Sequence, residues 1–324
     1  MNEMNSSVVK DLVRLARRGL AFLIICIGTY LLLLFILTHI KVTGNPIIYR
    51  ASQGLVQKGG FTYERFREFN PDSRHDILAF GSSRVNRGID PRVFEDAGYS
   101  IYNLGTDDQT PLNTKVLIEQ YVKPGKCRLV IIDIFDKIFS QGSLESSADL
   151  IQNLNDDNAA LQVAMAADDV RAINLLGIRM MLKNQAPSYK GDTKLYKGYR
   201  VKRNQKNDFT GDSYAYKTNK QNLRDFDAII KYLKSVNIPF LLVCQPIPSH
   251  INHENHRLLL KDIDPILKAN NVSLHDYSDD ATIVSYSDFA DESHLNSWGA
   301  EIYSKHLLKT LVSKEIQPLK VEEF

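Results

Sequence analysis

The sequence predicts a three-layer α/β/α domain of the flavodoxin-like kind, built on a parallel sheet and preceded by one transmembrane helix. Two observations support this prediction: an uncharged apolar run near the N-terminus, and, from Asp76 onward, short apolar runs that alternate with segments of helical period. The composition, 44% apolar and 24% charged, is that of a globular chain. A formal net charge of +2 gives no strong bulk field, so we expect no nucleic-acid partner.

The N-terminal apolar run covers residues 19–40, contains no Asp, Glu, Lys or Arg, and can cross a hydrocarbon core of ~30 Å at ~1.5 Å per residue. Lys10, Arg14, Arg17 and Arg18 precede it and few cations follow, so the positive-inside rule places the N-terminus in the cytoplasm. A cleaved signal peptide is the alternative, although no small-x-small cleavage site follows the run. We therefore expect a single-pass membrane protein whose main domain is extracytoplasmic, either periplasmic or at the cell surface.

The chain is expected to divide into a cytoplasmic segment (1–18), the membrane helix (19–40), a stalk (41–74) and the α/β domain (75–324). A short amphipathic helix is expected within the stalk, near residues 62–69. Residues 139–220 interrupt the βα rhythm with helical segments, notably 167–184, and then a basic and aromatic stretch without clear period. We interpret this region as an insertion in one domain, with a separate small domain as the alternative.

Within the domain, strands are expected at the short apolar runs and helices where apolar residues recur at helical spacing. Ligands bind at the carboxyl ends of the strands in such sheets, so the residues that follow each run are the candidate site. The expected strands are 77–80, 100–103, 129–134, 240–244 and 272–275, and the expected helices are 111–121, 222–235, 257–269 and 298–312.

The first run ends in "FGSSR", where Gly81 permits a close turn and a serine after it could attack an acyl carbon. A serine needs a base, and "DESHLNSWGA" supplies Asp291 and His294, three residues apart and just before a helix. Taken singly, these motifs are more typical of a simple turn with a serine N-cap and of a helix-capping carboxylate. Because the topology brings both to one edge of the sheet, their joint occurrence favours a nucleophile and its base.

Together, "FGSSR", "YNLG" and "DESHLNSWGA" resemble, in order and spacing, conserved blocks of the SGNH (GDSL-like) hydrolase superfamily. Within it the chain looks most like the membrane-anchored, extracytoplasmic branch of DltD-like and AlgX/AlgJ-like proteins, which is associated with acylation of bacterial envelope polymers. The resemblance implies Ser83 as nucleophile, His294 as general base and Asp291 as the residue that orients it. It also implies an oxyanion hole formed by the backbone N–H groups of Ser83 and Gly105.

Two positions depart from the family pattern. Asp108 stands where many relatives carry a second glycine, and "IIDIFDKIFS" after the third strand lacks the oxyanion asparagine of the third block. Asn86 and Gln109 are the candidate replacements for that donor. Arg84 and His250 are further candidates for substrate contact, since both follow expected strands.

The stretch "HINHENH" invites a metal interpretation, but the outer histidines are ~120° apart on a helix and no matching acidic partner is evident, so we expect no metal. Cys127 and Cys244 fall at opposite ends of two expected parallel strands, too far apart for a disulfide, so both are expected to be free and mostly buried. Acyl transfer at an activated serine requires no cofactor, and we expect none.

The sequence therefore predicts a serine acyl-esterase or O-acyltransferase that O-acetylates or deacetylates an extracytoplasmic polysaccharide or another acylated envelope polymer. The resemblance further implies a polytopic membrane protein as acyl donor. Because the same acyl-enzyme can be resolved by a sugar hydroxyl or by water, transfer and hydrolysis both stay open. The missing asparagine leaves a second hypothesis, a non-catalytic glycan-binding or assembly protein on a degenerate hydrolase fold.

Overall fold

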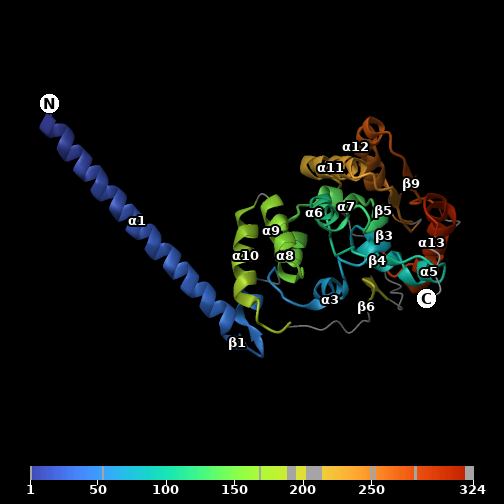
Figure 1. Cartoon of the computed structure of the whole chain (residues 1–324), viewed down its shortest axis with the longest axis horizontal. Helices are drawn as coiled ribbons and strands as arrows, with labels where there is room; N and C mark the ends of the chain where they lie inside the picture. The colour runs from blue at the N-terminus through green and yellow to red at the C-terminus, as the bar shows by residue number, and fades with distance from the viewer. Residues whose placement is uncertain are drawn as a thin grey trace.

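The computed structural model describes residues 2–52, 55–167, 169–187, 195–201, 214–248, 251, 253–280 and 283–317. A long N-terminal helix, α1 (Asn2–His39), projects away from one mixed α/β body (Figure 1). Its segment Val8–His39 is long and apolar enough to cross a membrane. Most large apolar side chains of that segment are exposed and do not pack against the rest of the protein. Such exposure is expected of a helix whose apolar surface is covered by lipid or by another protein.

The body is built on one parallel sheet, as the sequence predicts, and its five strands have the order β4-β3-β5-β8-β9. The chain runs from β3 to β4 on one side and then crosses to β5 on the other side of β3. This order places the topological switch at the carboxyl ends of β3 and β5, where such folds bind ligands. The strands are β3 (His75–Phe80), β4 (Ile101–Asn103), β5 (Cys127–Asp133), β8 (Phe240–Cys244) and β9 (Leu274–Asp276).

Both faces of the sheet are buried because successive side chains of each strand enter different cores. In β3, Leu78 and Phe80 belong to one core and Ile77 and Ala79 to the other. The first core is covered by α6 (Pro111–Tyr121), α11 (Lys220–Ser235) and α12 (Glu254–Asn270), and the second by α4 (Ser83–Gly88), α5 (Pro91–Glu95) and α13 (Ser297–Leu307). The predicted helices at 111–121, 222–235, 257–269 and 298–312 are present, the last of them continuing through η2 (Leu308–Val312) into α14 (Ser313–Glu315).

The predicted insertion contributes three helices and a short hairpin to the described residues, and the helices extend the first core. The helix expected at 167–184 begins later, because the Asp169 carboxylate caps it by accepting the Arg171 N–H at 2.8 Å. In the basic and aromatic stretch, Tyr199 is fully buried and the Arg200 guanidinium lies 3.8 Å from the Phe61 ring centre. The short helix α7 (Asp136–Ser140) begins before the insertion, whose elements are α8 (Leu144–Asn153), α9 (Asp157–Ala166), α10 (Val170–Leu182), β6 (Leu195–Tyr196) and β7 (Tyr199–Arg200).

The segment expected to be a stalk lies against the domain. It contains β1 (Lys41–Val42), β2 (Asn45–Pro46), α2 (Ile47–Ala51) and α3 (Gly60–Glu68). Val56 and Phe66 are buried in the first core, and the Lys58 ammonium donates to the carbonyls of Leu182, Lys183 and Gln185. These contacts make the segment part of the folded body, a relation that local sequence pattern does not reveal.

The two cysteines of the domain are free and buried, as predicted. Cys127 begins β5 and Cys244 ends β8, so the thiols lie at opposite ends of the sheet. Burial raises the pKa of Cys127 to about 12 and also raises the pKa of Cys244, which keeps both as unreactive thiols.

Candidate active site

The turn after β3 requires glycine and fixes which of the two serines faces the site. Gly81 has φ +144°, and a Cβ there would lie 2.7 Å from Val85 Cγ2. Ser82 then caps α4, its Oγ accepting the Arg84 N–H at 3.3 Å. Ser83, the first residue of α4, is the serine whose hydroxyl is left for other contacts.

A second loop presents the histidine and is fastened to α13 by an asparagine. Asn296 is fully buried; its Oδ1 accepts the N–H groups of Trp298 and Gly299 at 3.0 Å each, and its Nδ2 donates to the Ser287 carbonyl at 2.7 Å. Gly299 is required by close approach, because a Cβ there would lie 2.3 Å from the Asp288 carbonyl oxygen. The loop is thus held at both ends around Asp291 and His294.

Ser83, His294 and Asp291 lie within hydrogen-bond distance in series. Ser83 Oγ is 2.7 Å from His294 Nε2, and His294 Nδ1 is 2.6 Å from Asp291 Oδ1. The same carboxylate oxygen accepts the backbone N–H of His294 at 3.0 Å. With its Nδ1 proton directed at Asp291, the imidazole has its Nε2 lone pair available for the serine proton, which is the arrangement of a Ser-His-Asp triad.

The buried environment of His294 favours its neutral form. Burial is the largest effect and lowers the pKa of His294; the hydrogen bond that its ring donates to Asp291 raises the pKa, and nearby Arg87 lowers it. Arg87 Nη1 lies 3.6 Å from Asp291 Oδ2. A histidine with a lowered pKa is unprotonated at neutral pH and can act as a general base.

The predicted oxyanion donors differ in their availability. The Ser83 N–H meets no acceptor among the described residues, as expected at the first position of a helix. The Gly105 N–H instead donates to Asn103 Oδ1 at 3.1 Å. Asn103 is itself fully buried and donates to the carbonyls of Val85 and Ile89 at 2.7 and 3.1 Å, so it joins β4 to α4. An oxyanion role for Gly105 would require the Asn103 bond to be released, and that role stays a prediction.

The side chains predicted to replace the missing donor are internally bonded. Gln109 is fully buried; its Oε1 accepts from Thr106 and its Nε2 donates to Thr114 Oγ1. Asn86 Nδ2 donates to Asp107 Oδ1 at 3.0 Å, and its Oδ1 is buried without a partner. In this structure each amide nitrogen uses one of its two N–H groups to stabilise the loop beside Ser83.

The Arg84 side chain is also buried and bonded inside the protein, whereas the sequence predicted that it would contact the substrate. Its guanidinium is buried, donates to the Gln245 carbonyl at 2.6 Å and lies 3.7 Å from Asp133 Oδ2. Burial raises the pKa of Asp133 to about 6, although Arg84 opposes the shift. Arg84 thus links the nucleophile turn to the ends of β5 and β8. His250 lies outside the described residues.

One group of side chains could hold a metal ion. Cys244, His256 and Asp276 present ligand atoms that all lie within 4.8 Å of one another. His256 Nε2 and Asp276 Oδ2 are 3.0 Å apart and satisfy each other, and this pairing contributes to the lowering of the Asp276 pKa to about 2 against the effect of burial. The histidine thus joins α12 to β9.

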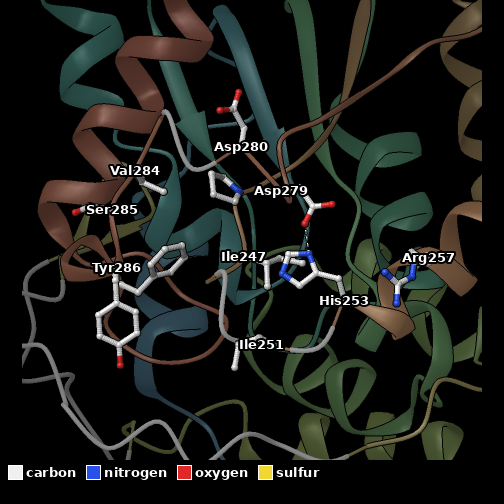
Figure 2. A pocket seen from close by; sticks show the side chains of 11 residues that line it. Ile247, Ile251, His253, Arg257, Asp279, Asp280, Val284, Ser285 and Tyr286 are labelled. Atoms are coloured by element: carbon white, nitrogen blue, oxygen red, sulfur yellow. Dashed lines mark ion pairs between the residues drawn. The ribbon is translucent and has the colours of Figure 1, made fainter.

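Two cavities lie near the segments that carry these three residues, although none of the three lines either cavity. A cavity of about 400 Å³ is lined by Pro246, whose carbonyl accepts from Arg84, and by Phe289 of the histidine loop. Figure 2 shows the His253 side chain in contact with the Asp279 carboxylate on one side of this cavity, with Tyr286 on the opposite wall. A larger cavity of about 900 Å³ lies near Asp107, the partner of Asn86, and extends along the segment that follows α2. Both are large enough for part of a small organic substrate.

Sequence reasoning missed three residues that hold the segments of Ser83, His294 and Asp291 in place. They are Asn103, Asn296 and Arg87, the last through its contact with Asp291. The two asparagines stand in the motifs "YNLG" and "HLNSWG". Asparagine before a turn glycine or at a helix start is a recognisable signal of side-chain to backbone bonding. The Arg87 contact spans two distant segments and has no local signal.

No family model matches the chain, and no curated protein does. Several solved structures are similar in fold at low identity. A protein from Bacteroides fragilis described as an acylhydrolase is 12% identical, with 86% of this chain and all of that one covered at a TM-score of 0.40. A GDSL-like lipase from Bacteroides thetaiotaomicron is 11% identical, with 79% of this chain and all of that one covered at 0.41. A mutant acetyl-xylooligosaccharide esterase from Geobacillus is 12% identical, with 73% and 94% covered at 0.36. At such values we base the function on the geometry of the site.

Proposed function

We propose that the protein is a membrane-anchored serine esterase or O-acyltransferase of the SGNH type, acting through Ser83, His294 and Asp291. The observation that supports this most is the continuous chain of short contacts from Ser83 Oγ through His294 to Asp291. The three residues come from two loops more than two hundred positions apart. Neither loop needs this arrangement to cap its helix, because Ser82 and Asn296 already do so.

The reaction follows from these contacts. Ser83 Oγ attacks the acyl carbon while His294 Nε2 takes its proton, and Asp291 stabilises the imidazolium that forms. The Ser83 N–H stabilises the tetrahedral oxyanion. His294 then returns the proton to the departing alcohol, leaving an acyl group on Ser83. Water or a sugar hydroxyl, deprotonated by His294, attacks this ester and regenerates the serine.

We further propose that the substrate is an acylated polysaccharide or related polymer outside the cytoplasmic membrane, and that a polytopic membrane protein supplies the acyl group if the reaction is transfer. The apolar helix at the N-terminus supports the membrane location, because a domain tethered there meets envelope polymers rather than soluble metabolites. The bonded state of Gly105 favours a second candidate, a glycan-binding protein without catalysis.

Labelling with a fluorophosphonate distinguishes the two candidates. We expect one covalent adduct on the detergent-solubilised full chain, measured by intact mass, and its loss in Ser83→Ala and in His294→Ala. Ser82→Ala is the matched control: its hydroxyl lies in the same motif but bonds the backbone, so labelling should persist. Wild-type protein that is folded and unlabelled would contradict the catalytic proposal and favour glycan binding.

A further inference from the structure

The last third of α1 lies side by side with α10, one of the helices of the insertion. The Tyr30 hydroxyl donates to Asn174 Oδ1, and Thr38 Oγ1 lies 3.8 Å from Met181 Sδ. From Tyr30 to Thr38 is ~12 Å along a helix, and from Asn174 to Met181 ~10 Å, so the two helices keep the same direction over this stretch. In Figure 1 they meet near the hairpin that follows α1.

This contact covers only one side of α1. Leu34 and Thr38, on the side of α1 that packs against the rest of the protein, are 5% and 0% exposed. On the remaining sides, Leu32, Leu33 and Phe35 are 59%, 54% and 52% exposed, at the same height along the helix. If α1 spans the membrane, these side chains require lipid around them, since water would leave a large apolar surface uncovered. The bilayer must then reach the level at which α10 packs against α1.

At that level α10 carries an apolar stripe of its own. Val170, Ile173 and Met180 are 81%, 45% and 76% exposed, and with Gly177 they follow the i, i+3, i+7 spacing of one helix face. This face is next to the one that contacts α1. Arg171 lies about 100° around the helix from Val170 and lines the cavity of about 900 Å³ instead.

Polar groups occur where this face ends. Lys183, 69% exposed, follows Met181 by two residues, which places it level with the end of the apolar run of α1. Lysines at such positions extend their ammonium groups to lipid headgroups while their aliphatic stems stay apolar. The preceding helix α9 adds two more exposed apolar side chains, Leu161 and Met165.

We propose that the Val170-Ile173-Met180 face of α10 is a membrane-inserted surface, embedded in the leaflet beside the domain and in contact with phospholipid acyl chains. The inference rests on the proposed transmembrane placement of α1. The catalytic domain is then fixed to the bilayer by two neighbouring helices and does not swing freely on one tether. This fixes the height and direction of the Ser83 site relative to the membrane.

Depth-dependent fluorescence quenching tests this surface in the full chain. A Cys26→Ala background leaves only the buried Cys127 and Cys244, so Ile173→Cys and Met180→Cys can each carry a single environment-sensitive fluorophore. Leu33→Cys on α1 reports whether that helix is in lipid. Ile302→Cys on α13, with a parent side chain 41% exposed, is the matched control away from α1. The labelled proteins are reconstituted in vesicles of phosphatidylcholine and phosphatidylglycerol with doxyl-labelled lipids.

We expect labels at 173 and 180 to be quenched by doxyl lipid to at least half the extent of the label at 33, and the label at 302 to be quenched only by aqueous iodide. Labels at 173 and 180 that behave like the label at 302 would overturn the proposal while leaving the transmembrane helix intact. If the labels at 173 and 180 are quenched neither by doxyl lipid nor by iodide, the proposal is wrong and this face of α10 is covered by protein. Absence of lipid quenching at 33 would remove the premise and the proposal together. Fluorophosphonate labelling of the same samples reports independently on the Ser83 site.

Discussion

Arg87 Nη1 lies 3.6 Å from Asp291 Oδ2, on the side of the carboxylate opposite to His294. Arg87 is four residues after Ser83 on α4, so one short helix presents both the proposed nucleophile and a cation that contacts Asp291, the proposed acid of the triad. Its proximity also helps to keep the pKa of His294 low, after the larger effect of burial. The arginine therefore contacts Asp291 directly, and its positive charge disfavours protonation of His294.

Replacing this cation should change the pH dependence. In Arg87→Gln, loss of the positive charge raises the pKa of His294, so the acidic limb of kcat/KM moves to higher pH and activity falls most below neutrality. The measurement is a pH profile of p-nitrophenyl acetate hydrolysis. Lys268→Gln, which removes an exposed cation paired with Asp264, should leave the profile unchanged. An acidic limb that stays in place or moves to lower pH would rule out this role for Arg87.

Loss of the triad carboxylate should cost activity more than stability. Asp291→Asn removes the acceptor that fixes the His294 tautomer and stabilises the imidazolium, and by analogy with serine proteases we expect kcat to fall by about 10⁴. The neighbouring substitution Glu292→Gln removes a carboxylate of the same loop outside the triad and should retain activity. Comparable losses in both variants would indicate general disruption of the loop.

The close approach of Gly105 predicts a purely steric effect. A Cβ at this position would lie 2.7 Å from Val85 Cβ and 3.0 Å from the Ser82 carbonyl oxygen. Gly105→Ala should therefore lower the free energy of unfolding by about 1–3 kcal/mol, as overpacking typically does. A Cβ at Gly142 would meet no atom within 4 Å, so Gly142→Ala is the matched control. Thermal unfolding in detergent compares the two, and equal midpoints would show that the turn can relax.

The buried state of Arg84 predicts that its removal destabilises the protein. Arg84→Ala leaves Asp133 and the carbonyls of Gln245 and Pro246 without their buried partner, at an expected cost of about 3–5 kcal/mol. The midpoint of thermal unfolding should fall accordingly at pH 7, where Asp133 is ionised. At pH 5 the loss should be smaller, because Asp133, with a pKa of about 6, is then largely protonated. A midpoint equal to wild type with a raised KM would instead support direct substrate contact.

The sequence by itself determined the sheet and its two loops of interest. The apolar runs that end at Gly81 and Asn103 located two of the strands, because parallel strands buried on both faces consist of nearly continuous apolar residues. It also determined the apolar N-terminal helix, and placed Ser83, Asp291 and His294 at one edge of the sheet, because carboxyl ends of parallel strands meet there.

Only the tertiary structure decided which polar groups are free and which are bonded internally. Arg84 and Gln109 are of residue types that often bind ligands, but both side chains are buried. Arg84 is bonded to a segment distant in sequence, and Gln109 to its own loop and the helix that follows. The sequence pattern of residues 41–74 is typical of a stalk. In the structure, however, Val56 is buried in the first core and Lys58 is hydrogen-bonded to the Leu182 carbonyl, so the segment packs against the domain. Such contacts join residues that are far apart in the chain. The local spacing of residue types does not indicate which distant group will form the hydrogen bond that a buried polar group needs once water is excluded.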